Sequence, residues 1–565
     1  MEMEGKIKGA LIKAAGVKSK KIVIEVPKQG FGDYAFPCFG LAREQKKNPV
    51  LIASELAKKL QKQLPKGIEK IEAVGGYVNF FIDKIYFSEL TVAEVLEEKE
   101  KYGSLQLKGK ALIEHTSINP NASPHVGRIR NAITGDILAR LLRFHGYDTE
   151  VHYYVNDVSK QMALLVLGAK GNETFDKLLN LYVSMSQEME EDPEIEQKVF
   201  EILKKIESRD KETLTKLDKL VKTAVEGQKK ILEKLGIFYD SFDYESIYLE
   251  TDTLKKILKE LEKSKRLEKD IEGRFILNQN KMKWQFEKEM KSPVLVLTRS
   301  DGTGLYPLRD LAYTIDKLKI APVNIIVLGE DHKLYFKQLS AALELLGYIA
   351  PRVVHYSFIL LKDKESKSGK KMSTRKGEVI LVSDFIREAI NKAKQEIKKR
   401  KRDKQVALDK VAEAIGVGAV RYGIARYELN KEILFDWHEA LNFEGNSAPY
   451  LQYSYARASN ILKKLGKITI GEENYKNIED KEYALIKEIG AFPEVAKAAL
   501  EQLKPHLLCN YAYELAQTFN DFYESCNVIN AEQGIKERRV SLVKATRQVL
   551  ANCLNIIGIP VIEAM

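Results

Sequence analysis

The sequence predicts a multidomain α/β protein: a parallel-sheet domain with a helical insertion, a small α+β domain before it, and helices after it. Three observations support this prediction. Residues 111–144 read as a strand, a turn and an amphipathic helix. Residues 323–329 form an apolar run that ends in glycine and is followed by polar residues, as in a buried parallel strand. From about residue 384 onward the apolar spacing is helical.

Length and composition narrow the class of protein. A chain of 565 residues exceeds what one hydrophobic core supports, so three or four domains are expected. Its 44% hydrophobic and 30% charged residues exclude a disordered chain. The net charge of +11 favours a polyanionic partner such as nucleic acid, although a surface rich in Lys and Glu can give this excess without one.

Targeting and cysteine patterns point to the cytoplasm. The first residues show no apolar signal segment, and no apolar run approaches the length of a membrane span, so we expect no membrane partner. The four cysteines match no zinc-binding spacing and suit buried thiols in a reducing compartment. They are Cys38, Cys509, Cys526 and Cys553.

The first hundred residues read as a small α+β domain. We expect a strand over 21–26, a helix over 48–60 that opens with a polar residue and a proline, and a strand over 76–82. Aromatic residues gather between and along these elements. Phe36 and Phe39 are expected in the core.

Tyr77 and Asn79 alternate with apolar residues and are expected to face outward. An exposed aromatic ring beside an amide can stack on an unpaired base and hydrogen-bond to it. A solvated strand face is an equally good interpretation of this pattern.

The central domain opens with a strand that ends near Glu114. A turn containing Pro120 and Pro124 follows, and then a helix begins beside His125 and Gly127. The apolar face of this helix is Val126, Ile129, Ile133, Ile137, Leu141 and Phe144. A helix N-terminus offers free N–H groups to an anion, and a glycine there lets a nucleotide approach the backbone. A strand over 149–156 completes a βαβ unit, which places ligands at the carboxyl ends of the strands.

The insertion, about 160–290, consists of Lys/Glu-rich helical patterns with solvated charged faces. We expect the sheet to resume over 293–298. Tyr306 and Asp310 then lie four residues apart on one face of a helix that Pro307 opens. A carboxylate beside an aromatic ring suits a cation, with a plain surface helix start as the alternative.

The second half of the sheet ends in Glu330 and His332, which we expect to line the ligand crevice. A helix over 333–346 and a strand over 352–358 follow. The loop 367–377 then combines lysines, glycines and hydroxyl groups, and such a loop can close over a polyphosphate. A solvated basic loop is the alternative.

The C-terminal part is helical. The basic run 398–402 either touches nucleic acid or is a solvated helix end, and 445–453 opens another helix. A stripe at helical spacing is predicted to be core: Leu508, Ala512, Leu515, Phe519 and Phe522.

Several of these motifs together resemble one family. His125-Val-Gly-Arg128 and Lys371-Met-Ser-Thr-Arg375 resemble the HIGH and KMSKS signatures of class I aminoacyl-tRNA synthetases. Within that class the chain resembles the arginyl-tRNA synthetases, through Asn119-Pro120, the stretch from Tyr306 to Asp310, residues 445–453 and the N-terminal stretch 32–38.

The resemblance implies a fold and a domain plan. An added N-terminal domain, 1–105, would meet the tRNA elbow. A Rossmann-like (HUP-type) catalytic domain would span 106–385, with the helical insertion inside it. A helical connecting region, 386–440, would lead to an all-helical anticodon-binding domain, 441–565.

The implied reaction is ATP-dependent activation of L-arginine to arginyl-adenylate and its transfer to the 3′ end of tRNA(Arg), with release of AMP and pyrophosphate. Activation in this family generally needs bound tRNA. Mg²⁺ would accompany ATP without a dedicated protein metal site. Members of this family are usually monomers, so the resemblance implies a monomer. Adenylation needs positioning and charge neutralisation more than a protein nucleophile.

The resemblance also assigns roles to residues. The catalytic group would be His125, Gly127, Arg128, Lys371, Ser373 and Arg375. ATP would contact Asn121, His125, Gly127, Arg128, Lys371, Met372 and Ser373. Arginine would contact Glu114, Asn119, Tyr306, Asp310 and Glu330. The tRNA would contact Tyr77, Asn79, Tyr450, Tyr453 and Met565.

Arg128 departs from the family pattern, because it replaces the second histidine of HIGH. We expect it to contact the ATP phosphates from the first helical turn. Two alternatives stay open: a synthetase-like protein that binds tRNA without charging it, and another nucleotidyl-transfer enzyme, such as a different class I synthetase or a small cytidylyltransferase. The long helical C-terminal half argues against the small transferases.

Overall fold

The computed structural model describes residues 2–16, 22–25, 27–28, 30–249, 252–280, 292–362, 369–370, 380–399, 405–466 and 473–563. The chain divides into two compact units, each described by itself. The first contains residues 1–103, 454–495 and 514–551, and the second contains 104–453, 496–513 and 552–565.

The N-terminal part of the first unit is an antiparallel three-stranded sheet with helices. Its strand order is β1 (Tyr34–Pro37), β3 (Tyr77–Ile82), β2 (Ile68–Val74). The helices are α1 (Glu2–Ala15), α2 (Phe39–Gln45), α3 (Pro49–Gln61) and α4 (Lys84–Glu98), followed by the 3₁₀ turn η2 (Lys99–Lys101). Asn48 caps α3 by accepting a hydrogen bond from the Val50 N–H, as its polar-Pro start predicts.

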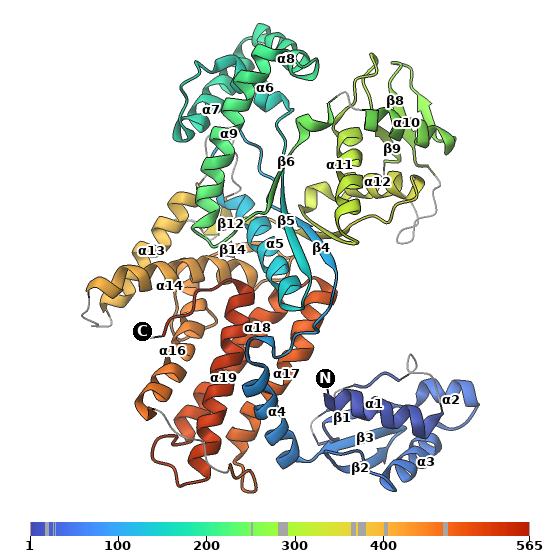
Figure 1. Cartoon of the computed structure of the whole chain (residues 1–565). Coiled ribbons are helices and arrows are strands. Elements are labelled where there is room, and N and C mark those ends of the chain that lie inside the picture. The colour runs from blue at the N-terminus through green and yellow to red at the C-terminus, as the bar shows by residue number, and fades with distance from the viewer. Residues whose placement is uncertain are drawn as a thin grey trace. The chain divides into compact units, whose positions relative to one another are not determined.

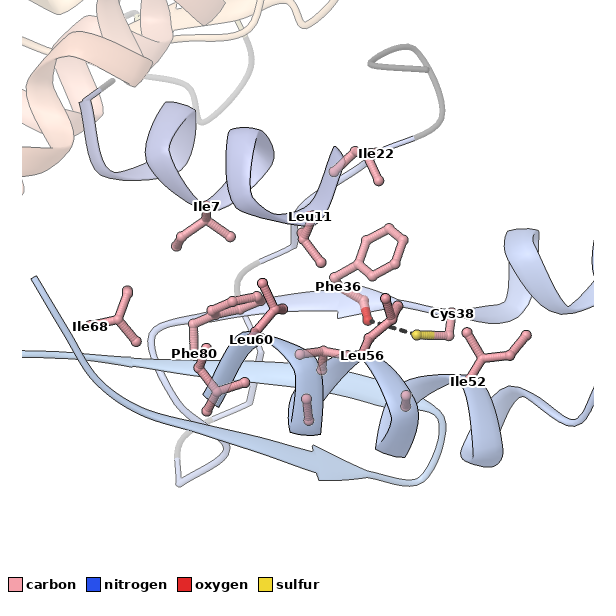
Figure 2. Packing of buried hydrophobic residues seen from close by; sticks show 14 of the residues in the cluster. Ile7, Leu11, Ile22, Phe36, Cys38, Ile52, Leu56, Leu60, Ile68 and Phe80 are labelled. Carbon is pink, nitrogen blue, oxygen red and sulfur yellow. Dashed lines mark hydrogen bonds between the residues drawn. The ribbon is translucent and has the colours of Figure 1, made fainter. Parts of the chain in front are cut away.

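The core of this sheet domain lies between the sheet and the helices. Figure 2 shows Ile7 and Leu11 of α1 facing Phe36 and Phe80 of the sheet. Cys38 is buried in the same cluster, and burial raises the pKa of its thiol to about 11. All four cysteines are free and buried, which confirms the expectation of buried thiols.

Three predictions for this region are wrong. Among residues 22–25 only Glu25 pairs, in a single antiparallel bridge to Ala35 of β1, so these residues do not form a strand. Phe39 is 41% exposed, and its ring packs edge-on against Tyr77 at 5.2 Å between centroids. Asn79 is buried rather than outward-facing; it lies on the central strand β3, opposite Ala35 of β1 and Glu72 of β2.

The second unit is organised around a five-stranded parallel sheet of order β11-β10-β4-β5-β6. The strands are β4 (Lys110–Glu114), β5 (Asp148–Val155), β6 (Ser241–Tyr244), β10 (Val323–Gly329) and β11 (Arg352–Tyr356). The predicted helix α5 (Val126–Phe144) packs against β4 and β5 (Figure 1). The chain order reverses between β4 and β10, and doubly wound sheets bind ligands at such a switch point.

The insertion is helical up to residue 233. Its helices are α6 (Lys160–Gly168), α7 (Phe175–Glu191), α8 (Pro193–Glu207) and α9 (Lys211–Glu233). The chain then returns to the parallel sheet as β6, continues through η3 (Glu245–Tyr248) and α10 (Asp252–Lys263), and forms a small antiparallel sheet of β7 (Leu267–Lys269), β8 (Phe275–Asn278) and β9 (Val294–Val296).

The prediction that 293–298 rejoin the main sheet is therefore wrong. β9 pairs antiparallel with β8, and β6 is the edge strand of the main sheet instead. A short apolar run fits either sheet, because only its pairing partner decides where it lies.

The remaining helices belong partly to the second unit and partly to the first. They are α11 (Tyr306–Ile320), η4 (Glu330–His332), α12 (Lys333–Leu345), α13 (Val382–Lys399), α14 (Gln405–Ala425), α15 (Trp437–Ala440), α16 (Ala448–Leu465), α17 (Asp480–Gln502), α18 (His506–Ser525) and α19 (Ile535–Ile557). A further three-stranded sheet has the order β13 (Gly369–Lys370), β12 (Ile359–Lys362), β14 (Ile433–Phe435).

The predicted stripe on α18 is fully buried, from Leu508 to Phe522. None of the described helices is both long and apolar enough to cross a bilayer.

A buried arginine holds α5 in place. Arg421 of α14 pairs with Asp136 of α5 and donates to the carbonyls of Leu235 and Ile557. Its guanidinium is fully buried. The helix that carries the predicted ATP site is thus fixed from its outer side by a charged, fully hydrogen-bonded contact.

Candidate active site

A cavity of about 790 Å³ lies at the carboxyl ends of the parallel strands. The ends of β4, β5, β10 and β11 and the starts of α5, α11 and α12 form its lining. This is the position that a doubly wound sheet predicts for a ligand, and it includes the switch point between β4 and β10. The predicted residues that line it are Glu114, Asn119, Asn121, His125, Gly127, Arg128, Tyr306, Asp310 and His332.

His125 and Gly127 form one side of the cavity at the start of α5. His125 is the N-cap residue of α5, and its side chain makes no capping hydrogen bond. Its buried Nδ1 has no hydrogen-bond partner among the described residues. A Cβ atom on Gly127 would lie 3.0 Å from the imidazole, so a side chain there would crowd the ring. Burial, followed by the nearby Arg128, lowers the pKa of His125 to about 4. The ring is therefore neutral at physiological pH and offers hydrogen bonds rather than charge.

The segments that flank the predicted phosphate loop meet this turn. The Val126 N–H donates to the Ile380 carbonyl and the Val382 N–H donates to the Pro124 carbonyl, each at 2.9 Å. On the other flank, β13 pairs with β12, and Ile359 of β12 lines the cavity. Lys371, Met372, Ser373 and Arg375 lie outside the described residues.

The opposite side of the cavity carries Asp310 on the second turn of α11. Its carboxylate accepts a hydrogen bond from the Tyr335 hydroxyl at 2.7 Å and a longer one from Thr314 at 3.4 Å. The Tyr306 ring lies 5.4 Å from the Tyr335 ring, between centroids. Burial raises the pKa of Asp310 to about 6; Lys317 lowers it, and Glu114 raises it.

Two further buried carboxylates near Asp310 already have cationic partners. Glu114, at the end of β4, is ion-paired with Lys317 of α11. Glu245 is ion-paired with Arg309 at 2.6 Å, and burial raises its pKa to about 7. Asp310 makes no ion pair with any described residue, so it is the carboxylate here that a cationic ligand could neutralise.

The remaining predicted residues of the site lie in different settings. Asn119 donates to the Gln161 side chain at 2.8 Å, and Asn121 is buried in the cavity lining. Glu330 does not line the cavity: its carboxylate accepts a hydrogen bond from Ser357 and pairs with Lys333 at 3.5 Å. The Ser357 hydrogen bond is also the main reason why the pKa of Glu330 is lowered.

None of the predicted tRNA residues that the structure describes is among the residues lining the cavity. Tyr77 and Asn79 are on β3 in the first unit, and Tyr77 is half-buried. Tyr450 and Tyr453 are on α16, where the Tyr450 ring contacts Tyr513 at 5.5 Å between centroids. Met565 lies outside the described residues.

Sequence reasoning missed three residues around Asp310. Tyr335 and Tyr154 line the cavity, and Lys317 lies behind it. The sequence did contain a signal for Lys317. Asp310, Thr314 and Lys317 recur at steps of four and three, so polar residues occupy one face of a helix that is buried. Nothing in the sequence indicates that this face meets Glu114.

Comparison with known proteins identifies matching families along the chain. The profile for the catalytic domain of class I tRNA synthetases (R) matches residues 91–437. The arginyl tRNA synthetase N terminal domain matches residues 1–82, and the DALR anticodon binding domain matches 451–565.

Similar proteins span the whole chain. An arginine–tRNA ligase of Methanocaldococcus jannaschii is 39% identical, over 96% of this chain and 97% of the relative. One from Methanocella arvoryzae is 40% identical, over 93% of this chain and 92% of the relative. The structure of Thermus thermophilus arginyl-tRNA synthetase matches with a TM-score of 0.82 at 28% identity, over 100% of this chain and 99% of that one. The chain belongs to the arginyl-tRNA synthetases, within class I of the aminoacyl-tRNA synthetases.

Proposed function

We propose that the chain is an arginine–tRNA ligase whose cavity in the second unit joins L-arginine to ATP as arginyl-adenylate before transfer to tRNA(Arg). One observation carries the proposal: a single cavity holds both the His125–Gly127 turn and the Tyr306–Asp310 pair. The turn offers backbone N–H groups at a helix N-terminus to a phosphate, and the pair offers a carboxylate to a guanidinium. These are the two reactants of the first step.

On the ATP side, the neutral His125 ring would hydrogen-bond the nucleotide through its unpartnered nitrogen. Gly127 would leave room for that ring and for the nucleotide. Arg128, which lines the cavity, would contact the phosphates, and Asn121 would contact the nucleotide nearby. Mg²⁺ would enter with ATP, since phosphate oxygens and water supply most of its ligands in such sites.

The loop residues Lys371, Ser373 and Arg375 would neutralise the transferring α-phosphate and the leaving pyrophosphate, and Met372 would contact ATP. Hydrogen bonds from 380–382 to the His125 turn support this assignment, because they tie the loop's trailing end to the ATP side. Charge neutralisation of this kind is what phosphoryl chemistry needs from a protein.

On the amino-acid side, Asp310 would bind the guanidinium, with Tyr306 and Tyr335 forming aromatic sides of its pocket. A planar guanidinium matches a carboxylate in two parallel hydrogen bonds, which a lysine ammonium cannot do. Glu114 and Asn119 would contact the rest of the arginine. Glu330 is left out of this set because its carboxylate is engaged by Ser357.

For tRNA, we propose that Tyr77 meets the elbow, and that Tyr450, Tyr453 and Met565 meet the anticodon. Asn79 would help only through a rearrangement, since it is buried. We further propose a monomer acting in the cytoplasm, where free buried cysteines are stable.

The test is an arginylation assay with ATP, labelled arginine and total tRNA, paired with an arginine-dependent ATP–pyrophosphate exchange run with and without tRNA. We expect arginyl-tRNA to accumulate and exchange to require tRNA. Tight tRNA binding with no arginyl-tRNA would favour a non-catalytic binding protein. Charging with a different amino acid would favour another class I synthetase.

A further inference from the structure

Lys317 is a buried cation that does not line the cavity and is still close to it. It lies two turns after Asp310 on α11 and is 1% exposed. Its ammonium is ion-paired with the Glu114 carboxylate and lies 4.2 Å from the centre of the Tyr313 ring. A lysine is rarely buried so completely without a specific partner, because removing its charge from water is costly.

The pair affects the charge close to Asp310. Of the three buried carboxylates Glu114, Glu245 and Asp310, the first two are ion-paired with Lys317 and Arg309, so Asp310 keeps one unpaired negative charge. That charge equals the single positive charge of a guanidinium. Without Lys317, two uncompensated carboxylates would share the site, and two like charges at short range disfavour the ionised form of one of them.

We propose that Lys317 is a positioning and charge-setting residue of the arginine pocket, which holds and neutralises Glu114 so that the guanidinium binds Asp310. The inference rests on the proposed assignment of this pocket to arginine. It adds a specificity determinant that never touches the substrate, since Lys317 acts only through Glu114 and through its charge.

A pH effect follows from the groups that face Asp310. They are Tyr306, Thr314 and Lys317 of α11, Tyr335 of α12, Glu114 of β4, Tyr154 of β5, and Glu245 of η3 with its partner Arg309. Among them Lys317 favours the ionised form of Asp310 and Glu114 opposes it. Removing the Lys317 charge therefore raises the pKa of Asp310 above its value of about 6, so more of the carboxyl is protonated at pH 7.

The experiment compares Lys317→Met with Lys317→Arg. For Lys317→Met we expect kcat/KM for arginine to fall by about tenfold or more at pH 7, since one unit of pKa corresponds to a factor of ten. The acidic break in its pH profile should move upward, and KM for ATP should stay unchanged. Lys317→Arg should restore most of the activity. The matched control is Lys319→Met, on the same helix but exposed and paired with Asp316.

A double-mutant cycle separates charge setting from simple folding. If Lys317 acts by neutralising Glu114, Lys317→Met should cost much less in a Glu114→Gln background than in the wild type. Rates are normalised to active sites by pre-steady-state burst, so loss of folded protein alone does not imitate the effect. Equal costs in both backgrounds, or an unchanged arginine KM and pH profile in Lys317→Met, overturn the proposal.

Asp310→Asn distinguishes this failure from failure of the pocket assignment. If Asp310→Asn leaves the arginine KM unchanged, the cavity is not the arginine site and both inferences fall. If Asp310→Asn raises KM for arginine strongly while Lys317→Met behaves as wild type, the assignment of the pocket to arginine holds and only the role of Lys317 is wrong.

Discussion

Asp310→Asn is the substitution that tests the arginine pocket most sharply. The amide has nearly the size of the carboxylate, and its oxygen can still accept the hydrogen bond from Tyr335, so the pocket keeps its shape. What is lost is a buried, cavity-lining carboxylate that makes no ion pair with a described residue, unlike Glu114 and Glu245. Removing one partner of a buried ion pair costs about 3–5 kcal/mol.

That free energy corresponds to a loss of roughly 10²- to 10⁴-fold in kcat/KM for arginine, at about 1.4 kcal/mol per factor of ten. The loss should fall on arginine and leave KM for ATP within about twofold, because the ATP side lies at the start of α5. Steady-state aminoacylation with either substrate varied measures both values. The matched control is Asp316→Asn, a half-buried aspartate on the same helix that pairs with Lys319 and accepts a hydrogen bond from Tyr248 but does not line the cavity.

The same carboxylate predicts a pH dependence. The pKa of Asp310 is raised to about 6, so its ionised form is lost as pH falls through that value, whereas the guanidinium stays charged throughout. In the wild type, kcat/KM for arginine should level off about one unit above pH 6 and fall about tenfold per pH unit well below it. A side-chain amide does not titrate in this range, so the break should vanish in Asp310→Asn. A variant with a normal arginine KM, or one that keeps the wild-type break, would refute the reasoning.

Three further predictions concern other parts of the molecule. Arg128→Ala should raise KM for ATP or lower kcat by about tenfold or more, the cost of at least one hydrogen bond to a charged group, while KM for arginine changes little. Unchanged ATP kinetics would remove Arg128 from the phosphate site. Arg421→Met should lower the thermal unfolding midpoint by several degrees, because Asp136 and two buried carbonyls lose their donor, whereas the exposed Arg387→Met should not; equal midpoints would contradict the role of Arg421. Affinity for tRNA should fall steeply between about 50 and 200 mM salt as phosphate counterions are released, and a flat titration by filter binding would argue against a charged interface.

The apolar periodicity of the sequence was enough to predict two elements that line the cavity. The helix after His125 and the strand 323–329 have long, regular apolar patterns, and both lie where the patterns predict. Short strands were harder to assign to a sheet from the sequence. The run 293–298 and the four-residue strand β6 carry too few residues to show which sheet they join, and their partners are set by the fold around them.

Burial of single side chains also depended on neighbours that the sequence does not show. Asn79 alternates with apolar residues as an outward residue would, but it lies on a central strand and is buried. The site divides in the same way. Sequence motifs predicted His125, Gly127, Tyr306 and Asp310 as site residues. The Glu114–Lys317 pair joins residues 203 positions apart, and only the structure shows it.

The most direct test is a crystal structure of the enzyme with a non-hydrolysable arginyl-adenylate analogue. The account predicts the guanidinium of the analogue within hydrogen-bond distance of the Asp310 carboxylate, its adenosine against His125 and Gly127, and the Glu114–Lys317 pair intact. A guanidinium bound to Glu114 with Lys317 displaced, or an analogue seated outside the cavity, would contradict it.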